Sequence, residues 1–395
     1  MEVFKSHPSY KNVESICLTL QKNGFTAWLA GGCVRDGLLS VLPKDFDVAT
    51  DAEPEKVESL FKKTVAVGKA FGVIRVVFDQ DDIEVATFRK DGAYIDGRRP
   101  VNVTKATPQE DAQRRDFTIN AMFYDLENRE VKDYVGGLSD LKDRKIKTVG
   151  VPERRFTEDK LRIMRAVRFV AQLDFNLEET TLKAVRAMAG DIKSVSWERI
   201  NDEMTKLFLG LRPDRGMGLL HETGILKNIL PEISSSNSLS NSFSKMVECD
   251  DRVLMGWVLL LVAISREQKD KIYKRFRLSN SFKISLEELI ELIESLKIFD
   301  SLPLHKKKID IAHSLVVLAF QYLEQIGINV EKLKEFRNKF PQLPNAFVGS
   351  KELSELGVKP GKLMGDLLEK TFNAQLDDKF SDKNGAIEWV KQNLK

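Results

Sequence analysis

Residues 29–36 read LAGGCVRD, and residues 44–50 read KDFDVAT. In the first stretch, Gly31 and Gly32 follow a short apolar run and lead into an amphipathic segment, which predicts a strand, a tight turn and a helix. Two glycines at such a junction let the backbone approach a phosphate, and the first turn of the helix adds free N–H groups. Arg35 lies where its guanidinium could reach the same phosphates. The glycine pair alone is equally compatible with a turn that binds nothing.

The second stretch carries two acidic residues, Asp45 and Asp47, two positions apart. On a strand, residues i and i+2 point to the same side, so their carboxylates would converge. Like charges this close repel unless a cation lies between them, and paired carboxylates next to substrate phosphates suit Mg²⁺. Glu84, within another apolar run, is a candidate third acid whose partner is either a metal ion or an ordinary salt bridge. A solvated strand end is the alternative interpretation of the aspartate pair.

The rest of the first 150 residues indicates a mixed α/β region. Two alternating runs, over residues 72–78 and 82–88, predict a hairpin, and residues 118–125 suggest a further strand. From about residue 156 the apolar spacing becomes that of helices, and we predict no strand beyond it. Residues 233–242 (ISSSNSLSNS) are predicted to form a loop or linker within this helical part.

The composition excludes several classes of protein. The 395 residues include 62 Lys and Arg against 59 Asp and Glu, a formal net charge of +3, so a nucleic-acid partner must meet a local basic face. Three cysteines without a CxxC pair exclude a disulfide scaffold and a zinc-finger cluster. The N-terminus lacks the apolar core of a signal peptide, and the longest apolar run, residues 253–264, is too short to cross a bilayer. We expect a cytoplasmic protein with that run in a buried helix.

Two segments between the acidic strands and the helical part carry further candidate residues. Residues 89–100 contain two glycines, a proline and four basic residues, which predicts a mobile loop that would be a lid beside a phosphate site. Residues 114–121 read RRDFTINA. There, Arg115 is a candidate for binding a triphosphate, and Asp116 or Asn120 for hydrogen bonding to a ribose hydroxyl.

Residues 156–169 (FTEDKLRIMRAVRF) are predicted to form the first of the later helices. Asp159 and Arg162 lie three residues apart and would be neighbours on one face, with Arg165 and Arg168 continuing at the same spacing. An exposed ion pair is one interpretation. The other is that an aspartate offering acceptors and an arginine offering donors together complement the edge of a nucleobase.

Seven motifs in this order, between about residues 25 and 232, resemble those of the class II tRNA nucleotidyltransferases of bacteria and eukaryotes and of the related bacterial poly(A) polymerases. Both groups belong to the polymerase-beta-like nucleotidyltransferase superfamily. A weaker resemblance, GVKPGKLMG at residues 357–365, is to the tail that these enzymes place on the acceptor stem of tRNA. One departure is Ser40, which stands where the family often has glycine. The seven motifs read LAGGCVRDGLL, KDFDVAT, EVATFRKDGAYIDGRRP, RRDFTINAMFYD, DYVGGLSDL, RFTEDKLRIMRAVRF and ERINDEM.

The resemblance implies a fold of the α+β class: a nucleotidyltransferase head over residues 1–150, a helical neck over 151–230 that selects the base, and a helical body and tail over 231–395 that bind RNA. It also implies two Mg²⁺ ions as cofactors, CTP and ATP as substrates, tRNA as partner through its acceptor stem and 3′ end, and no membrane. For single residues, the resemblance implies metal binding by Asp45 and Asp47 with Glu84 as third acid, and triphosphate contacts from Gly31, Gly32, Arg35 and Arg115. It implies ribose discrimination by Asp116 and Asn120 and base pairing by Asp159 and Arg162. Arg165 and Arg168 would support the triphosphate or the pocket.

The product of the reaction is set by finer signals. Enzymes of the family that add only CC lack the loop before RRDFT, whereas residues 89–113 are full-length here. The bacterial poly(A) polymerases carry a double-basic G-[RK]-R-F element where residues 68–72 read GKAFG. We therefore favour template-independent CCA addition by two-metal nucleotidyl transfer. Poly(A) synthesis or A-only addition is the alternative, and an inactive RNA-binding relative is a further one, against which the intact aspartate pair argues.

Overall fold

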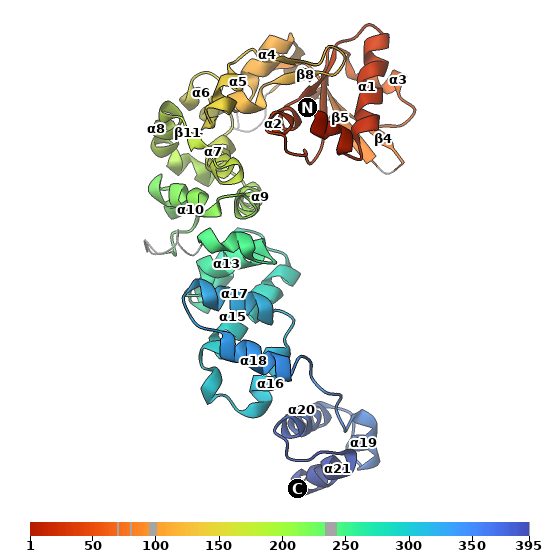
Figure 1. The fold of residues 1–395 in the computed structure, drawn as a ribbon, viewed down its shortest axis with the longest axis vertical. Helices are drawn as coiled ribbons and strands as arrows, with labels where there is room; N and C mark the ends of the chain where they lie inside the picture. Colours follow the sequence, from red (N-terminus) through yellow and green to blue (C-terminus); the bar gives the residue numbers. More distant parts are fainter. Residues whose placement is uncertain (69–70, 80, 95–100, 234–242, 395) are drawn as a thin grey trace. The chain divides into compact units, whose positions relative to one another are not determined.

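The computed structural model describes residues 1–395 except 69–70, 80, 95–100, 234–242 and 395. The chain divides into two compact units, Met1–Ser240 and Asn241–Lys395 (Figure 1). The first unit combines a mixed β-sheet with helices, and the described part of the second is helical. The fold class expected from the sequence, an α/β head followed by helices, is confirmed.

A seven-stranded sheet forms the centre of the first unit, in the order β3-β4-β5-β2-β1-β8-β9. β1 is antiparallel to both β2 and β8, whereas β2 and β5 run parallel and place Asp47 opposite Glu84. The predicted hairpin is confirmed, since β4 and β5 pair antiparallel from Val73 opposite Ala86 to Phe78 opposite Asp81. The strands are β1 (Ala27–Ala30), β2 (Asp47–Thr50), β3 (Thr64–Gly68), β4 (Val73–Phe78), β5 (Asp81–Thr87), β8 (Phe123–Asp125) and β9 (Glu130–Lys132).

Apolar faces of short helices hold this sheet. α1 (Tyr10–Lys22) packs on β1 and β2, and its buried side chains recur at helical spacing, at Val13, Ile16, Cys17 and Leu20. α2 (Gly32–Leu38) follows β1, α3 (Pro54–Leu60) packs on β4 and β5, α4 (Pro108–Arg114) packs on β6 (Arg89–Asp91), and α5 (Gly137–Lys142) covers the turn before β8. β6 pairs with β7 (Val103–Lys105) in a small separate sheet. Burial of these apolar faces fixes where the loops at the ends of β1 and β2 lie.

Two predictions about strands were wrong. Residues 118–125 do not form one strand: Thr118–Asn120 is a 3₁₀ turn, and only Phe123–Asp125 joins the sheet. A Cβ at Gly137 would lie 2.4 Å from the Thr118 carbonyl oxygen, so α5 packs closely on this turn. A strand also follows residue 156, because β11 (Asn176–Leu177) pairs with β10 (Lys145–Ile146). Two residues are too few to produce a recognisable alternating pattern.

The rest of the first unit is helical. α7, the longest of these helices, packs against α9 and α10 through a face that is buried at Ile163, Val167 and Val170. The predicted helix over residues 156–169 is in fact two helices, α6 and α7, that meet at Asp159. The helices are α6 (Pro152–Glu158), α7 (Leu161–Leu173), α8 (Glu179–Ala187), α9 (Trp197–Phe208), α10 (Pro213–Glu222) and α11 (Ile225–Ile229).

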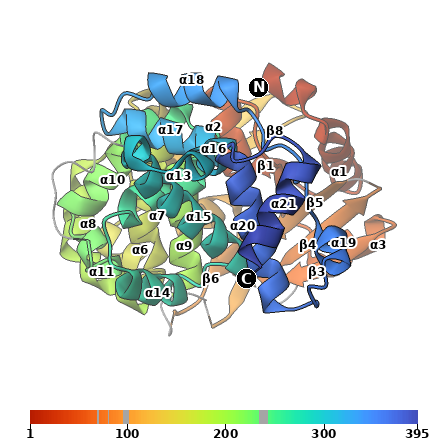
Figure 2. The same cartoon turned by 90° about the horizontal axis from the view of Figure 1, so that it is seen from below.

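The described part of the second unit consists of helices. The predicted buried helix over residues 253–264 is confirmed as α13, and none of the described helices is long and apolar enough to cross a membrane. α19, α20 and α21 share a small core of their own around Leu353, Leu367 and Val390, and α20 and α21 lie side by side (Figure 2). The helices are α13 (Arg252–Leu261), α14 (Arg266–Arg275), α15 (Asn280–Lys297), α16 (Leu304–Ala312), α17 (Val316–Gln325), α18 (Glu331–Lys339), α19 (Ser350–Glu355), α20 (Lys362–Leu376) and α21 (Lys383–Asn393).

The predicted loop at residues 233–242 falls almost wholly outside the described residues. The boundary between the two units lies within it. Ser40, where the family often has glycine, adopts a positive φ of 59°, a conformation that glycine tolerates better than serine.

Candidate active site

The glycine turn after β1 forms one wall of a cavity. Gly31 has a φ of +77° and precedes α2, and its backbone N–H donates to the carbonyl oxygen of Met122 at 3.1 Å. A Cβ at Gly31 would lie 3.1 Å from Nη1 of Arg115, so a larger residue would press on that guanidinium. Both the backbone conformation and the close approach of Arg115 therefore favour glycine here.

The cavity has a volume of 380 Å³ and gathers most of the residues that the sequence singled out. Its predicted members are Gly31, Gly32, Arg35, Asp47, Arg115, Asp116, Asn120, Asp159, Arg162 and Arg165. The residues that the prediction did not assign are Arg114, Leu161, Phe169 and Arg199. Asp45, Glu84 and Arg168 are not among the residues that line it.

The two aspartates lie at the start of β2. Asp47 is the first residue of the strand, whereas Asp45 precedes it, so the expectation that both lie on a strand is wrong for Asp45. Protein atoms packed around the Asp47 carboxyl, together with the negative charges of Asp45 and Glu84, raise its pKa to about 6, and Arg115 opposes this. The side chain still reaches solvent. A carboxylate crowded by two others is the environment in which a divalent cation with oxygen ligands is favoured.

Glu84 already has a protein partner. Its Oε1 accepts a hydrogen bond from Nη2 of Arg75 at 2.9 Å, and Arg75 also pairs with Asp82 at 3.1 Å. The salt bridge that was one of the two alternatives for Glu84 is therefore present. Within the described ranges, no group of three His, Cys, Asp or Glu side chains is arranged to hold a metal ion. Asp45 and Asp47 thus remain the oxygen donors that fit a cation shared with a substrate.

A hydrogen-bonded chain of side chains crosses the cavity from α2 to α7. Arg35 is buried, donates from Nη1 to the Asn120 side-chain oxygen at 2.6 Å, and pairs with Asp36. The Asn120 amide donates to Oδ1 of Asp116 at 3.3 Å, and Oδ2 of Asp116 accepts from Nε of Arg165 at 2.9 Å. Asp116 and Asn120, both candidates for ribose binding, are thereby held in fixed orientations.

Charges around Asp116 act in the opposite direction from those around Asp47. Burial by itself raises the pKa of Asp116, but the positive charges of Arg165 and then Arg162 outweigh it and hold that pKa well below its ordinary value. Asp116 is therefore ionised, and its charge is balanced by the protein.

Arg115 and Arg114 are held by an acid that the sequence interpretation did not single out. Asp111 is buried on α4 and forms ion pairs with Arg114 at 2.7 Å and Arg115 at 3.0 Å. Its Oδ1 also accepts the backbone N–H of Arg89, at the base of the predicted loop. The i,i+3 and i,i+4 spacing of Asp111 to the two arginines could have revealed it. Both guanidiniums are thereby placed along the cavity wall.

The predicted ion pair between Asp159 and Arg162 is not formed. Asp159 lies between α6 and α7 with extended backbone angles, so the two residues are not on one continuous helix. Its carboxylate pairs with Arg199 at 2.8 Å, from α9. Arg162 pairs instead with Glu158 at 2.9 Å. Both Asp159 and Arg162 nevertheless face the cavity.

Arg168 is part of the wall behind the cavity. It is buried, its Nε donates to Glu203 at 2.8 Å, and its guanidinium lies 3.5 Å from the centre of the Phe169 ring. Arg35 and Arg165 each lie 5.4 Å from the same ring. Phe169, which the prediction did not assign, therefore supports three arginines by contact with its face.

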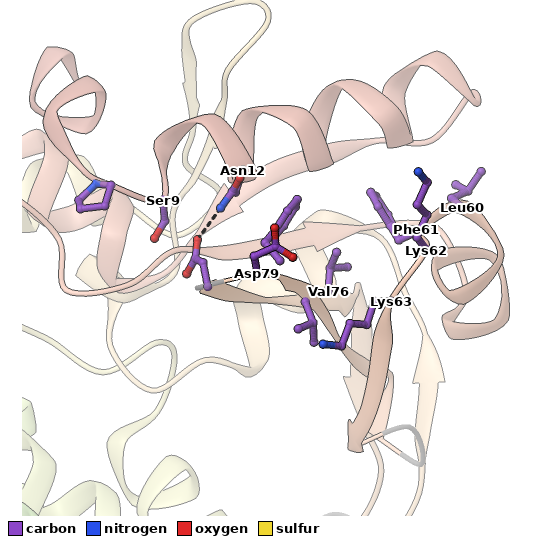
Figure 3. Close-up of a pocket in the computed structure, with 12 residues that line it drawn as sticks. Ser9, Asn12, Leu60, Phe61, Lys62, Lys63, Val76 and Asp79 are labelled. Atoms are coloured by element: carbon purple, nitrogen blue, oxygen red, sulfur yellow. Dashed lines mark hydrogen bonds between the residues drawn. The ribbon is translucent and has the colours of Figure 1, made fainter.

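A second cavity, of 840 Å³, lies among α1, the end of α3 and the β4–β5 hairpin (Figure 3). Ser9, Lys62 and Lys63 line it, and the Asn12 amide donates to Asp81 across it at 2.9 Å. It contains none of the residues predicted from the sequence, so size alone does not mark it as the active site.

Comparison with known proteins identifies the family. The model for the poly(A) polymerase head domain matches residues 27–147, and the model described as the probable RNA- and SrmB-binding site of polymerase A matches residues 174–236. The chain is 31% identical to the CCA-adding enzyme of Staphylococcus epidermidis, over 99% of this chain and 100% of the relative. It is 32% identical to that of Staphylococcus aureus strain MRSA252, over 98% of both chains. The chain belongs to the CCA-adding enzyme family.

Solved structures agree with membership of the CCA-adding enzyme family. The Bacillus stearothermophilus CCA-adding enzyme in complex with CTP superposes with a TM-score of 0.79 at 26% identity, covering 98% of each chain. The Thermotoga maritima CCA-adding enzyme complexed with tRNA has the same fold, with a TM-score of 0.74 at 20% identity, covering 100% of this chain and 98% of that one. The resemblance seen in the sequence and the polymerase-beta-like head are thereby confirmed.

Proposed function

We propose that this CCA-adding enzyme family member adds C, C and A to the 3′ end of tRNA, with CTP and ATP as substrates and no nucleic-acid template. The observation that carries the proposal is a single cavity. It joins the glycine turn and Asp47 of the sheet to a row of arginines and to Asp159 of the helical part. A nucleoside triphosphate needs these three surroundings together: positive charge for its phosphates, acids for its cation and a polar group for its base.

We assign the phosphate end to the sheet side of the cavity. Arg115 and Arg114, held by Asp111, supply positive charge beside the glycine turn, where Arg115 approaches Gly31 closely. Asp116 and Asn120, fixed by Arg165 and by each other, would bind the ribose hydroxyls. Because these groups are oriented before substrate binds, little reorganisation is needed at the transition state.

We assign the cation to Asp45 and Asp47. Bound there, two Mg²⁺ ions would supply a lowered pKa at the RNA 3′-hydroxyl and charge neutralisation for the triphosphate and departing pyrophosphate. The chain's own residues bind and orient the two substrates, and nucleotidyl transfer proceeds without a covalent intermediate on the protein. Burial, and then the negative charges of Asp45 and Glu84, raise the pKa of Asp47, and a bound cation would act against this shift.

We further propose a division of labour along the chain: head (1–150) for chemistry, neck (151–230) for base selection, and body and tail (231–395) for RNA binding. The base-selecting assignment of the neck rests on Asp159 and Arg162, which face the cavity from the junction of α6 and α7. In the tail, Lys359 and Lys362 lie exposed around Gly361 at the start of α20, where tRNA phosphates could be met.

The proposal is tested by incubating the chain with Mg²⁺, tRNA lacking its last three nucleotides, and labelled CTP or ATP, singly and mixed. We expect two C additions with CTP alone and a CCA end with both nucleotides. Long adenylate tails would instead show a poly(A) polymerase. With tRNA ending in CC as a second substrate, addition of A to it and of nothing to the shorter tRNA would show an A-adding enzyme. No incorporation, with tRNA still bound, would show the inactive relative and overturn the proposal.

A further inference from the structure

Three charged side chains form a row across neighbouring strands of the sheet. Asp47 on β2 lies opposite Glu84 on β5, and Glu84 lies opposite Arg75 on β4. Residues directly opposite each other on paired strands project from the same face of the sheet, and paired strands lie about 4.8 Å apart. Glu84 therefore has a proposed metal ligand as its neighbour on one side and a guanidinium on the other.

The row lies on the less buried face of the sheet. Ile83 and Val85, on either side of Glu84, are buried, as is Ile74 beside Arg75. The Glu84 side chain, in contrast, is 46% exposed and that of Arg75 is 34% exposed. Dissolved ions therefore have access to this row of side chains.

Arg75 determines the direction in which the Glu84 side chain extends. Its Nη2 donates to Oε1 of Glu84 at 2.9 Å, and its Nε lies 3.1 Å from Oδ1 of Asp82 on the same strand as Glu84. The Glu84 carboxylate is thereby drawn toward β4 and away from β2. This agrees with the finding that, among the described residues, no three His, Cys, Asp or Glu side chains converge as a metal site. Exposed ion pairs of this kind contribute little to stability, so Glu84 can exchange Arg75 for another cation.

A guanidinium and a divalent cation compete for the same carboxylate. While Arg75 binds Glu84, the carboxylates left for a cation at the proposed site are those of Asp45 and Asp47, and the charge of Arg75 adds repulsion. Mg²⁺ binds through one or two carboxylates when substrate phosphates complete its set of ligands. A low affinity for the free ion thus makes occupancy of the site depend on the triphosphate.

We infer that Arg75 is a positioning residue that lowers the cation affinity of the nucleotide-free site by holding Glu84 away from Asp45 and Asp47. This inference rests on the proposed function, because it concerns the cation that the same site uses. Loss of Arg75 frees Glu84 to become a third oxygen ligand beside Asp47, so the free ion binds more tightly.

The test is binding of Mn²⁺, as a probe for Mg²⁺, to the nucleotide-free protein, measured by electron paramagnetic resonance. We expect Arg75→Ala to lower the Kd for Mn²⁺ at least about fivefold relative to wild type, because the site gains a ligand and loses a repelling charge. Glu84→Gln should change the Kd by no more than about twofold, because the carboxylate that it removes is already bound to Arg75. The double variant Arg75→Ala/Glu84→Gln should return to within about twofold of wild type, since the two substitutions act through one interaction.

Lys63→Ala is the matched control. It removes one positive charge from the connection between α3 and β3, at a side chain that lines the 840 Å³ cavity. In 0.1 M salt it should leave the Kd unchanged within about twofold, because an exposed charge outside the row is largely screened. Arg75 is partly exposed, so its variants should fold, and thermal unfolding checks this. Arg75→Gln takes the place of Arg75→Ala if the alanine variant does not fold.

The possible results separate the inference from the proposed function. An unchanged Kd in Arg75→Ala overturns the inference, as does a lower Kd that persists in the double variant or appears equally in Lys63→Ala. Absence of Mn²⁺ binding in wild type and Arg75→Ala alike also overturns it. Each of these results leaves nucleotide addition by the wild type to be judged by its own assay. Failure of the wild type to incorporate CTP, with the Mn²⁺ results as expected, overturns the proposed function and not the competition for Glu84.

Discussion

Two carboxylates face the same cavity, and their surroundings shift their pKa values in opposite directions. Asp47, on the sheet, has Asp45 and Glu84 as neighbours, and its pKa is raised to about 6. Asp116, which lies between sheet and helices, is bonded to Arg165, and its pKa is held well below the ordinary range. At Asp116 the positive charges of arginines outweigh burial, whereas at Asp47 burial and two negative neighbours outweigh the opposing charge of Arg115. The difference fits the proposed roles, in which Asp116 orients substrate and Asp47 binds a metal ion.

The largest effect expected from this contrast is on activity. Asp45→Ala and Asp47→Ala should each reduce nucleotide incorporation by at least about 1,000-fold, because the cation that neutralises the triphosphate loses its ligands. Binding of tRNA should change little, since RNA contacts are assigned to the helical part. Incorporation by purified variants and a gel-shift titration with tRNA are the measurements. Retained activity in clean preparations of both variants would refute the metal assignment.

Alanine substitutions of Asp116 and Asp47 should also differ in their effect on stability. Asp116→Ala leaves Arg165, a partly buried side chain, with only the more distant Glu203 carboxylate as ion-pair partner among the described residues, and we expect it to lower the free energy of unfolding by about 2 kcal/mol. Asp47→Ala removes a carboxylate that its neighbours repel and should leave stability unchanged or slightly raised. Urea unfolding without Mg²⁺ measures both. Equal destabilisation by the two variants would contradict the comparison.

Much of the fold could be predicted because its patterns are local. The run Ala27–Ala30 before two glycines, and the alternating residues of the β4–β5 hairpin, determine their own structures. The break between α6 and α7 could not be predicted, because no proline or glycine marks it. It arises where Asp159 takes extended angles and its side chain accepts the Leu161 N–H. That contact competes with continuation of the helix.

The candidate site was predictable in its residue types and less so in its pairings. Gly31, Asp47 and Arg115 were expected near a nucleotide, and the structure brings them to one cavity. The pairing of Asp159 was predicted from the spacing of a continuous helix. Its actual partner, Arg199, lies 40 residues away in sequence, on another helix. Such contacts follow from the packing of α7 on α9, which residue spacing does not encode.

A smaller effect should appear in the pH dependence of stability. Because the pKa of Asp116 is lower in the folded state than in the unfolded chain, its contribution is complete above the ordinary aspartate pKa of about 3.9 and is lost as the pH falls below it. Asp116→Asn should therefore be less stable than wild type at pH 6, by up to about 2 kcal/mol, and the gap should narrow between pH 4 and pH 3. Urea titrations of both proteins at each pH measure the gap. A gap that is constant with pH would mean that the Asp116 charge contributes nothing.

The smallest effect is the thermal stabilisation expected when Mg²⁺ binds in the absence of nucleotide. It tests the metal-binding role proposed for Asp47 without involving the triphosphate. A ligand that binds only the folded state stabilises it by RT ln(1 + [L]/Kd), which is about 1 kcal/mol when its concentration is a few times Kd. For a protein of this size that corresponds to a rise of about 2 °C in Tm. We expect this rise for wild type and for Asp116→Asn, whose metal ligands are intact, and its absence in Asp47→Ala. Because Ca²⁺ also prefers carboxylate oxygens, it should produce a similar rise, whereas equal ionic strength from NaCl should not. An equal rise in Asp47→Ala would place the ion elsewhere and remove the reason for treating the two carboxylates differently.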